Sequence, residues 1–182
     1  MSNKSKEVVI VNAIRTPIGT YKGSLKNMKS HALGSIVIKE VLSRSKFDKD
    51  EIDEVIMGQV LTTGAGQNPA RQAAINAGIP ISKPAHIINQ VCGSGLRAVI
   101  SGYQSIKLGE AKNIISGGQE NMSIAPHSIF YRDKKKISED KLLDTMINDG
   151  LIDAFNNYHM GVTAENVAKK FHISRQDQDE FA

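Results

Sequence analysis

The chain has 182 residues, and 40% of them are hydrophobic. Its net charge is +4, and it has a single cysteine, Cys92. This length suits one domain with part of a second, and the composition is ordinary for a globular α/β protein. One cysteine excludes an internal disulfide and a cysteine-cluster metal site. The five histidines show no metal-ligand spacing, so no metal is expected.

The positive charge is partly concentrated in one run, YRDKKK at residues 131–136. A nucleic-acid binder would carry a basic stripe interleaved with aromatic residues, so no nucleic-acid partner is expected. A solvated basic loop is the simpler interpretation of the run, and an anionic small molecule is the better guess for a partner. The chain holds no stretch near the ~20 apolar residues of a membrane span and no apolar leader, so we expect a cytoplasmic protein with no membrane partner.

Strand-like and helix-like patterns alternate along the first 118 residues. Short apolar runs predict strands, and 3.6-residue periodicity bounded by capping residues predicts helices. Ser30 is expected to cap the first helix, whose inner face would carry Leu33, Ile36, Val37, Val41 and Leu42. The predicted strands are 8–11, 55–60, 86–89 and 113–116, and the predicted helices are 30–43, 70–77 and 93–108. This order is typical of a mainly parallel sheet with flanking helices and right-handed crossovers.

The character of the chain changes after Gly118. Residues 119–158 are polar and loop-like, with one weak helical pattern near 142–155. A helix is predicted around 163–171, and Ser174 is expected to cap another that reaches Ala182 after about two turns. We therefore expect two regions, 1–118 and 119–182, with the second cut short.

Cys92 is the residue whose placement points to chemistry. It lies between a predicted strand and a helix that opens with Gly93 and Gly95, where ligands gather in α/β sheets. A thiol at a helix N-terminus meets free backbone N–H groups, which favour the thiolate and can stabilise an oxyanion. The flanking glycines leave room for a substrate carbonyl to approach.

Two other interpretations of this segment remain open. A free cysteine is most often a small buried core residue. In addition, Gly93, Gly95 and Ala98 fit the dinucleotide fingerprint G-x-G-x-x-G/A, which would indicate an NAD(P)-dependent oxidoreductase. The acidic residue that this fingerprint requires would be Glu120, which comes late in the chain.

The segment INQVCGSGLRA at residues 88–98 resembles the acyl-enzyme cysteine motif of the thiolases, the acetyl-CoA acetyltransferases. The similarity extends in order along nearly the whole chain. The other segments that carry it are VNAIRTPIG at 11–19, GQNPARQA at 66–73, SGGQENMS at 116–123, HMGVTAEN at 159–166 and SRQDQDEFA at 174–182.

This resemblance implies a thiolase-like α/β fold: the first of two similar halves, with part of an inserted loop domain. It implies acetyl-CoA C-acetyltransferase activity, a reversible Claisen condensation through S-acyl-Cys92, with coenzyme A thioesters as substrates and no other cofactor. His159 and Met160 match positions that line the family's acyl and pantetheine pocket. The backbone N–H of Cys92 would form part of an oxyanion site.

The resemblance also implies what the 182 residues lack. The family works as homodimers or homotetramers, and its second catalytic cysteine, with an assisting histidine and asparagine, belongs to the C-terminal half. We therefore expect the chain alone to be inactive. The alternative is a non-catalytic fragment that pairs with an intact thiolase subunit through residues 62–71 and 86–91.

Overall fold

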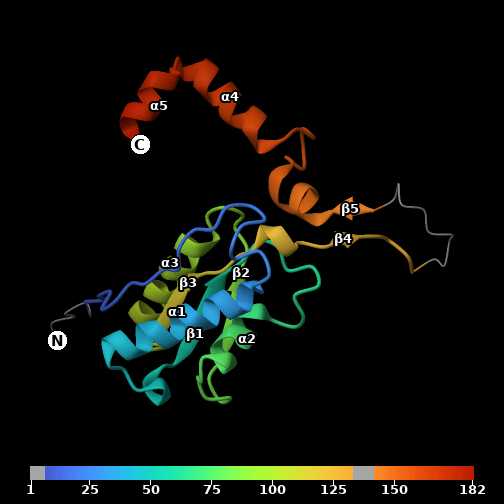
Figure 1. The fold of residues 1–182 in the computed structure, drawn as a ribbon. Helices are drawn as coiled ribbons and strands as arrows, with labels where there is room; N and C mark the ends of the chain where they lie inside the picture. The colour runs from blue at the N-terminus through green and yellow to red at the C-terminus, as the bar shows by residue number, and fades with distance from the viewer. Residues whose placement is uncertain (1–6, 133–141) are drawn as a thin grey trace.

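The computed structural model describes residues 7–132 and 142–182, and its centre is a three-stranded parallel sheet. The strand order is β2 (Ala85–Ile88), β1 (Glu54–Gly58), β3 (Ile114–Gly118), so β1 lies in the middle (Figure 1). Gly58, the last residue of β1, pairs with Ile88 on one side and with Gly118 on the other. The carboxyl ends of all three strands therefore meet at one edge, and the parallel α/β prediction is confirmed.

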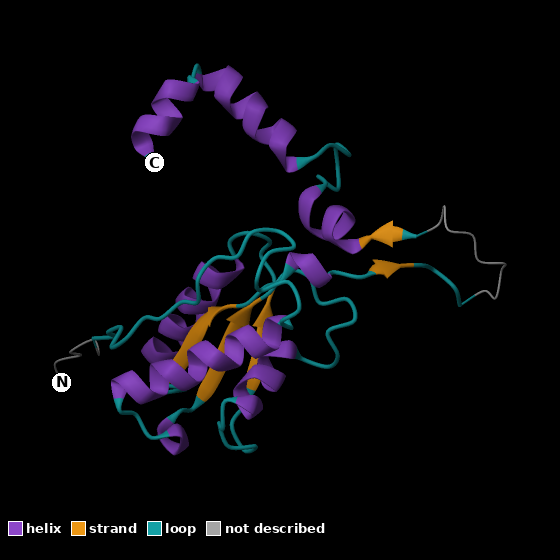
Figure 2. Ribbon diagram, in the orientation of Figure 1, coloured by secondary structure: helices purple, strands orange, loops and turns teal. Residues whose placement is uncertain are grey.

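Helices cover both faces of the sheet (Figure 2). On one face, α1 (Ser30–Ser45) and α2 (Pro69–Asn76) pack against each other and enclose the core cluster. Val55 and Met57 of β1 belong to this cluster, whereas the intervening Ile56, which is 1% exposed, does not. Because side chains alternate along a strand, Ile56 faces the other side, where α3 (Ser94–Leu108) packs on β1 and β3.

The start and the inner face of α1 differ from the prediction. Lys29, and not Ser30, is the N-cap residue, and Ser30 is a buried residue of the first turn. The buried face carries Ser30, Gly34, Ser35 and Ile38, whereas Ile36 is exposed. A Cβ on Gly34 would lie 3.2 Å from the Cβ of Ala73, so the two helices approach through small residues. A prediction built on large apolar residues misses such a contact.

Residues 8–11 do not form the predicted strand. They are extended but unpaired, and Val9, Ile10 and Val11 are each more than 60% exposed. A β-branched run becomes a strand only when a neighbouring backbone pairs with it. Within the described residues this run has no such neighbour.

The C-terminal region is built from small elements that lead away from the sheet (Figure 1). Its parts are η2 (Met122–Ile124), β4 (His127–Ser128), β5 (Leu143–Asp144), a π-turn at Ile147–Leu151, α4 (Met160–Phe171) and α5 (Arg175–Phe181). The weak helix predicted near 142–155 is confirmed only over residues 145–151, which are helical and include the π-helical turn, whereas Leu143 and Asp144 form β5. Ser174 caps α5 as predicted, in a capping box with Asp177.

The chain exposes far more surface than a compact protein of its mass. Its accessible surface is 13143 Å² at 19.8 kDa, whereas a compact monomer of that mass exposes about 8,600 Å². The excess includes large apolar side chains on the outer face of α3: Leu96, Ile100, Tyr103 and Leu108 are 38–75% exposed.

Two carboxylates join the strands at opposite ends of the sheet. Before β1, Asp53 accepts hydrogen bonds from the backbone N–H groups of Lys112 (2.7 Å) and Asn113 (3.0 Å), which lower its pKa. Beyond β3, Glu120 accepts from Val60 (2.8 Å) and Leu61 (3.1 Å). Burial of Glu120 raises its pKa, and these hydrogen bonds only partly oppose the rise.

An Asp53→Asn variant should lose stability at neutral pH and little at acidic pH. The lowered pKa of Asp53 means that its contribution is present above the ordinary value of 3.8 and disappears as the pH falls through the folded-state pKa. After solvent screening we expect a loss of about 0.5–1 kcal/mol at pH 7. Urea unfolding at pH 7 and at about pH 3 measures it, and an equal loss at both would contradict the interpretation.

The Glu120→Gln substitution should show the opposite dependence on pH. Because the pKa of Glu120 is raised above 4.5, the folded state holds its proton more tightly than the unfolded state, and stability falls as the pH rises through that window. The stability of the glutamine variant relative to the parent should therefore increase from about pH 4 upward. Thermal melts across this range test it, with Glu110→Gln as the matched surface control. A stability difference between Glu120→Gln and the parent that does not change with pH would contradict the raised pKa of Glu120.

Candidate functional site

Cys92 lies in the turn between β2 and α3, where the sequence placed it. It is an exposed free thiol. Gly93 follows as the N-cap of α3, and no side chain caps this helix end. The N–H of Ser94 donates to the Val91 carbonyl, but the next amides of a first helical turn have no partner within the helix. The start of α3 therefore offers these N–H donors and the positive end of the helix dipole beside the thiol. The prediction of a buried core cysteine is therefore wrong.

Three glycines let the first turn of α3 touch the ends of two strands. A Cβ on Gly58 would lie 2.4 Å from the carbonyl carbon of Ser94 and 2.5 Å from the nitrogen of Gly95, which no side chain tolerates. A Cβ on Gly118 would lie 3.4 Å from the Cα of Gly95. The helix start therefore rests on the carboxyl ends of β1 and β3, backbone against backbone. The glycine that the dinucleotide fingerprint would assign to a cofactor, Gly95, packs on the protein itself.

The turn that carries Cys92 is tight. Gly93 N–H donates to the carbonyl of Gln90 (3.1 Å) and Ser94 N–H donates to that of Val91 (3.1 Å), after which Arg97 N–H bonds to Gly93 as the helix proceeds. Gln90 and Cys92 also form an isolated bridge. Val91 has a φ of +48°, a left-handed conformation that is rare for a β-branched residue. Sequence reasoning did not anticipate this strained residue.

A buried amide pair lies on the residues that follow the two strands. Gln59 is 2% exposed and Gln119 is 6% exposed, and Gln119 donates through Nε2 to Oε1 of Gln59 (2.9 Å). Gln59 in turn donates to the carbonyl of Leu61 (2.7 Å). The only sequence signal for the pair was the parallel Gly-Gln steps at residues 58–59 and 118–119.

The two predicted substrate-binding residues begin α4. His159 is the N-cap residue, and its Nδ1 accepts a hydrogen bond from Gly161 N–H (2.9 Å), while Met160 opens the helix. In Figures 1 and 2, α4 lies apart from the sheet and from α3. The structure therefore does not bring His159 and Met160 to Cys92, and their role stays a prediction.

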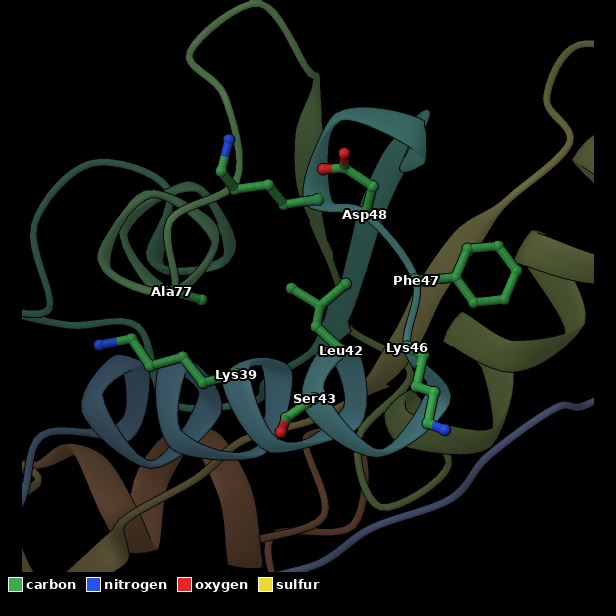
Figure 3. A pocket seen from close by; sticks show the side chains of 8 residues that line it. Lys39, Leu42, Ser43, Lys46, Phe47, Asp48 and Ala77 are labelled. Carbon is green, nitrogen blue, oxygen red and sulfur yellow. The ribbon is translucent and has the colours of Figure 1, made fainter.

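An open hollow lies elsewhere in the described part of the chain. It is formed by the last turns of α1, by the segment that enters β1 through η1 (Lys49–Glu51), and by Ala77 after α2. Figure 3 shows Leu42 and Ala77 facing this hollow and the ring of Phe47 turned away from it. Because it borders the segment before β1, it lies at the amino ends of the strands, opposite the end that carries Cys92.

Within residues 7–132 and 142–182, no helix combines the length and the apolar character needed to cross a bilayer. In the same described part of the chain, no group of three or more His, Cys, Asp or Glu side chains is arranged to hold a metal ion.

Comparison with known proteins identifies the family. The family described as "Thiolase, N-terminal domain" matches residues 8–182. The chain is 54% identical over 176 residues to an acetyl-CoA acetyltransferase of Paracoccus denitrificans, covering 97% of this chain and 45% of the relative. It is 52% identical over all 182 residues to the cytosolic acetyl-CoA acetyltransferase of Rattus norvegicus, covering 46% of that protein.

A third relative, a probable acetyl-CoA acetyltransferase of Escherichia coli, is 53% identical over 178 residues, which are 97% of this chain and 45% of the relative. The chain thus spans about half the length of the curated relatives it matches. The family match covers nearly every residue, including the turn that presents Cys92. The chain belongs to the thiolase family, and its residues 8–182 match the family's N-terminal domain.

Proposed function

We propose that the chain is the N-terminal part of an acetyl-CoA C-acetyltransferase, which reversibly joins two acetyl-CoA molecules into acetoacetyl-CoA through an S-acetyl-Cys92 intermediate. The observation that carries the proposal is the position of the single cysteine, exposed at the uncapped start of α3. The acetyltransferase names of relatives that are 52–54% identical support the choice of reaction.

The first step is a thioester exchange. The Cys92 thiolate attacks the carbonyl carbon of acetyl-CoA, the bond from that carbon to the CoA sulfur breaks, and the CoA thiolate leaves and takes up a proton. One thioester replaces another, so the free energy changes little. While the carbonyl oxygen carries negative charge, the N–H of Cys92 and the first amides of α3 are the donors available to stabilise it.

The second step needs a base to remove a proton from the methyl group of the second acetyl-CoA. Cys92 already carries the acetyl group at this stage, and the chain has no other cysteine. The resemblance to the thiolases assigns this base to the C-terminal half of the enzyme. Complete turnover would therefore require residues beyond these 182.

His159 and Met160 are the proposed substrate contacts. Because Nδ1 of His159 accepts the Gly161 N–H bond, the neutral ring carries its proton on Nε2, which can donate to a substrate oxygen. Met160, partly buried beside it, offers an apolar surface to the acyl or pantetheine part. This arrangement would require α4 to reach the Cys92 turn in the full-length enzyme.

The remaining parts of the proposal concern the whole enzyme. Coenzyme A thioesters would be its substrates with no further cofactor, and it would act as a cytoplasmic homodimer or homotetramer, in line with the cytosolic name of the rat relative. A second candidate role is a non-catalytic fragment that pairs with an intact subunit. The exposed apolar side chains of α3 favour it, since a partner would cover them.

The chain alone should accept an acetyl group on Cys92. Incubation with acetyl-CoA, followed by intact mass spectrometry, should show a single acetyl adduct, because this thioester exchange needs only the turn that presents the thiol, which lies wholly within the described residues. The Cys92→Ala variant should show none. A folded parent chain that gains no adduct would mean that the thiol depends on the missing half for activation.

Steady-state turnover should be absent. Thiolysis of acetoacetyl-CoA by the 182-residue chain, followed by the loss of its absorbance, should not exceed the rate of the Cys92→Ala variant. Measurable turnover above that control would show that the second base lies within these residues. It would also overturn the proposal that the chain is only part of the enzyme.

A further inference from the structure

Val91, the residue before Cys92, adopts a conformation that its own side chain disfavours. Its φ is +48°, and a β-branched residue in the left-handed region is a strained outlier. The side chain is 47% exposed, so core packing does not hold it there. The strain must therefore be maintained by bonds to the backbone of the turn.

Two side chains supply those bonds, one from each side of Val91. Asn89 accepts the Val91 N–H through Oδ1 (2.9 Å). Ser94 donates its hydroxyl to the Val91 carbonyl (2.6 Å) and accepts the Gln90 N–H on the same oxygen (2.9 Å). Ser94 is 4% exposed, so water competes little for its hydroxyl. The N–H and the carbonyl of Val91 are thus each bonded to a side chain.

The usual structural roles of these residues do not explain the arrangement. A serine at a helix start commonly caps the amides of its own helix. Ser94 instead lies inside the first turn, the N-cap is Gly93 without a side-chain bond, and the Ser94 hydroxyl turns back to the strand side. Asn89 also reaches across to the segment after β1, donating through Nδ2 to the Val60 carbonyl (3.4 Å).

The geometry of Val91 sets the position of the thiol. The start of α3 is immobilised by its contacts with Gly58 and Gly118, and β2 is fixed by its pairing with β1. Val91 and Cys92 join these two fixed parts. If Val91 relaxed to an extended conformation, Cys92 would move away from the first amides of α3.

We propose that Asn89 and Ser94 are positioning residues of the Cys92 turn: together they hold Val91 in its left-handed conformation and so keep the thiol beside the N-terminal amides of α3. The relevance of this arrangement to catalysis depends on the proposed function, in which Cys92 is the nucleophile. The positioning itself does not, since it concerns the reactivity of the thiol towards any electrophile.

The rate of alkylation of Cys92 by iodoacetamide tests the proposal in the 182-residue chain. Asn89→Ala and Ser94→Ala should each slow the reaction about fivefold or more, since the positive end of α3 would no longer stabilise the negative charge that the displaced sulfur carries as it attacks. Asn89→Asp keeps the acceptor for Val91 N–H and should restore at least half of the parent rate. Matched controls are Ser101→Ala, two turns along α3, and Asn76→Ala, at the end of α2; both should react within twofold of the parent.

A double substitution separates positioning from general loosening. Glycine adopts positive φ without strain, so in a Val91→Gly background the Asn89 bond is no longer needed to hold the turn. Adding Asn89→Ala to Val91→Gly should therefore change the alkylation rate less than twofold. An equal slowing by Asn89→Ala in both backgrounds would overturn the proposal, as would parent-like rates in both single alanine variants.

Two further measurements keep the outcomes distinct. Circular dichroism melts establish that each variant is folded. If Ser94→Ala does not fold, the proposal is tested by the substitutions of the exposed Asn89, made in the parent and in the Val91→Gly background. Acetylation by acetyl-CoA, measured in the same set, reports on the proposed function. Slowed alkylation of the two alanine variants without any acetyl adduct in the parent would uphold the positioning role and refute acyl transfer by the 182-residue chain alone. Alkylation at the parent rate in both alanine variants, with a normal acetyl adduct in the parent, would refute the positioning role and uphold acyl transfer.

Discussion

The direct contact between the first turn of α3 and the ends of β1 and β3 determines where everything else in the site can lie. Gly58 is required there because its Cβ would lie 2.4 Å from the backbone of Ser94 and would separate the helix from the strand, whereas a Cβ on Gly95 or Gly118 would only reach van der Waals contact with the neighbouring backbone. This contact fixes the direction of the helix axis relative to the sheet, and with it the location of the unpaired amides. Cys92 obtains its surroundings from this placement, since no charged side chain is bonded to it among the described residues.

The hydrogen bonds around the carboxyl ends of the strands extend the same constraint outward. Glu120 ties the segment after β1 to the segment after β3, and the buried Gln59 and Gln119 side chains join the same two segments. Asn89 connects this layer to the Cys92 turn. Polar groups at this edge thus orient the segments that follow the strands. The sheet face covered by α1 and α2 relies instead on apolar contacts around Met57.

Much of this arrangement could be predicted from the sequence where the signal is local. The helix predicted at 70–77 forms as α2, Ser174 forms its capping box, and the strand-to-helix turn at Cys92 follows from residues that are neighbours in the chain. The predictions failed where the outcome depends on distant partners. Residues 8–11 have the composition of a strand but no paired backbone. The inner face of α1 is set by Gln119 and Ala73, which lie far along the chain from it. The strain at Val91 is different, because it depends on its near neighbours Asn89 and Ser94 and on side-chain bonds that no sequence pattern announces.

The large exposed surface of the chain has a thermodynamic consequence. The heat capacity change and the denaturant dependence of unfolding both scale with the surface that becomes exposed. A folded state that already exposes 13143 Å² has less left to uncover than a compact domain of the same length. Its stability curve against temperature should therefore be shallow, and its urea transition broad. Docking of a partner on the apolar face of α3 would sharpen both, so the breadth of an unfolding transition reports directly on whether that face is covered.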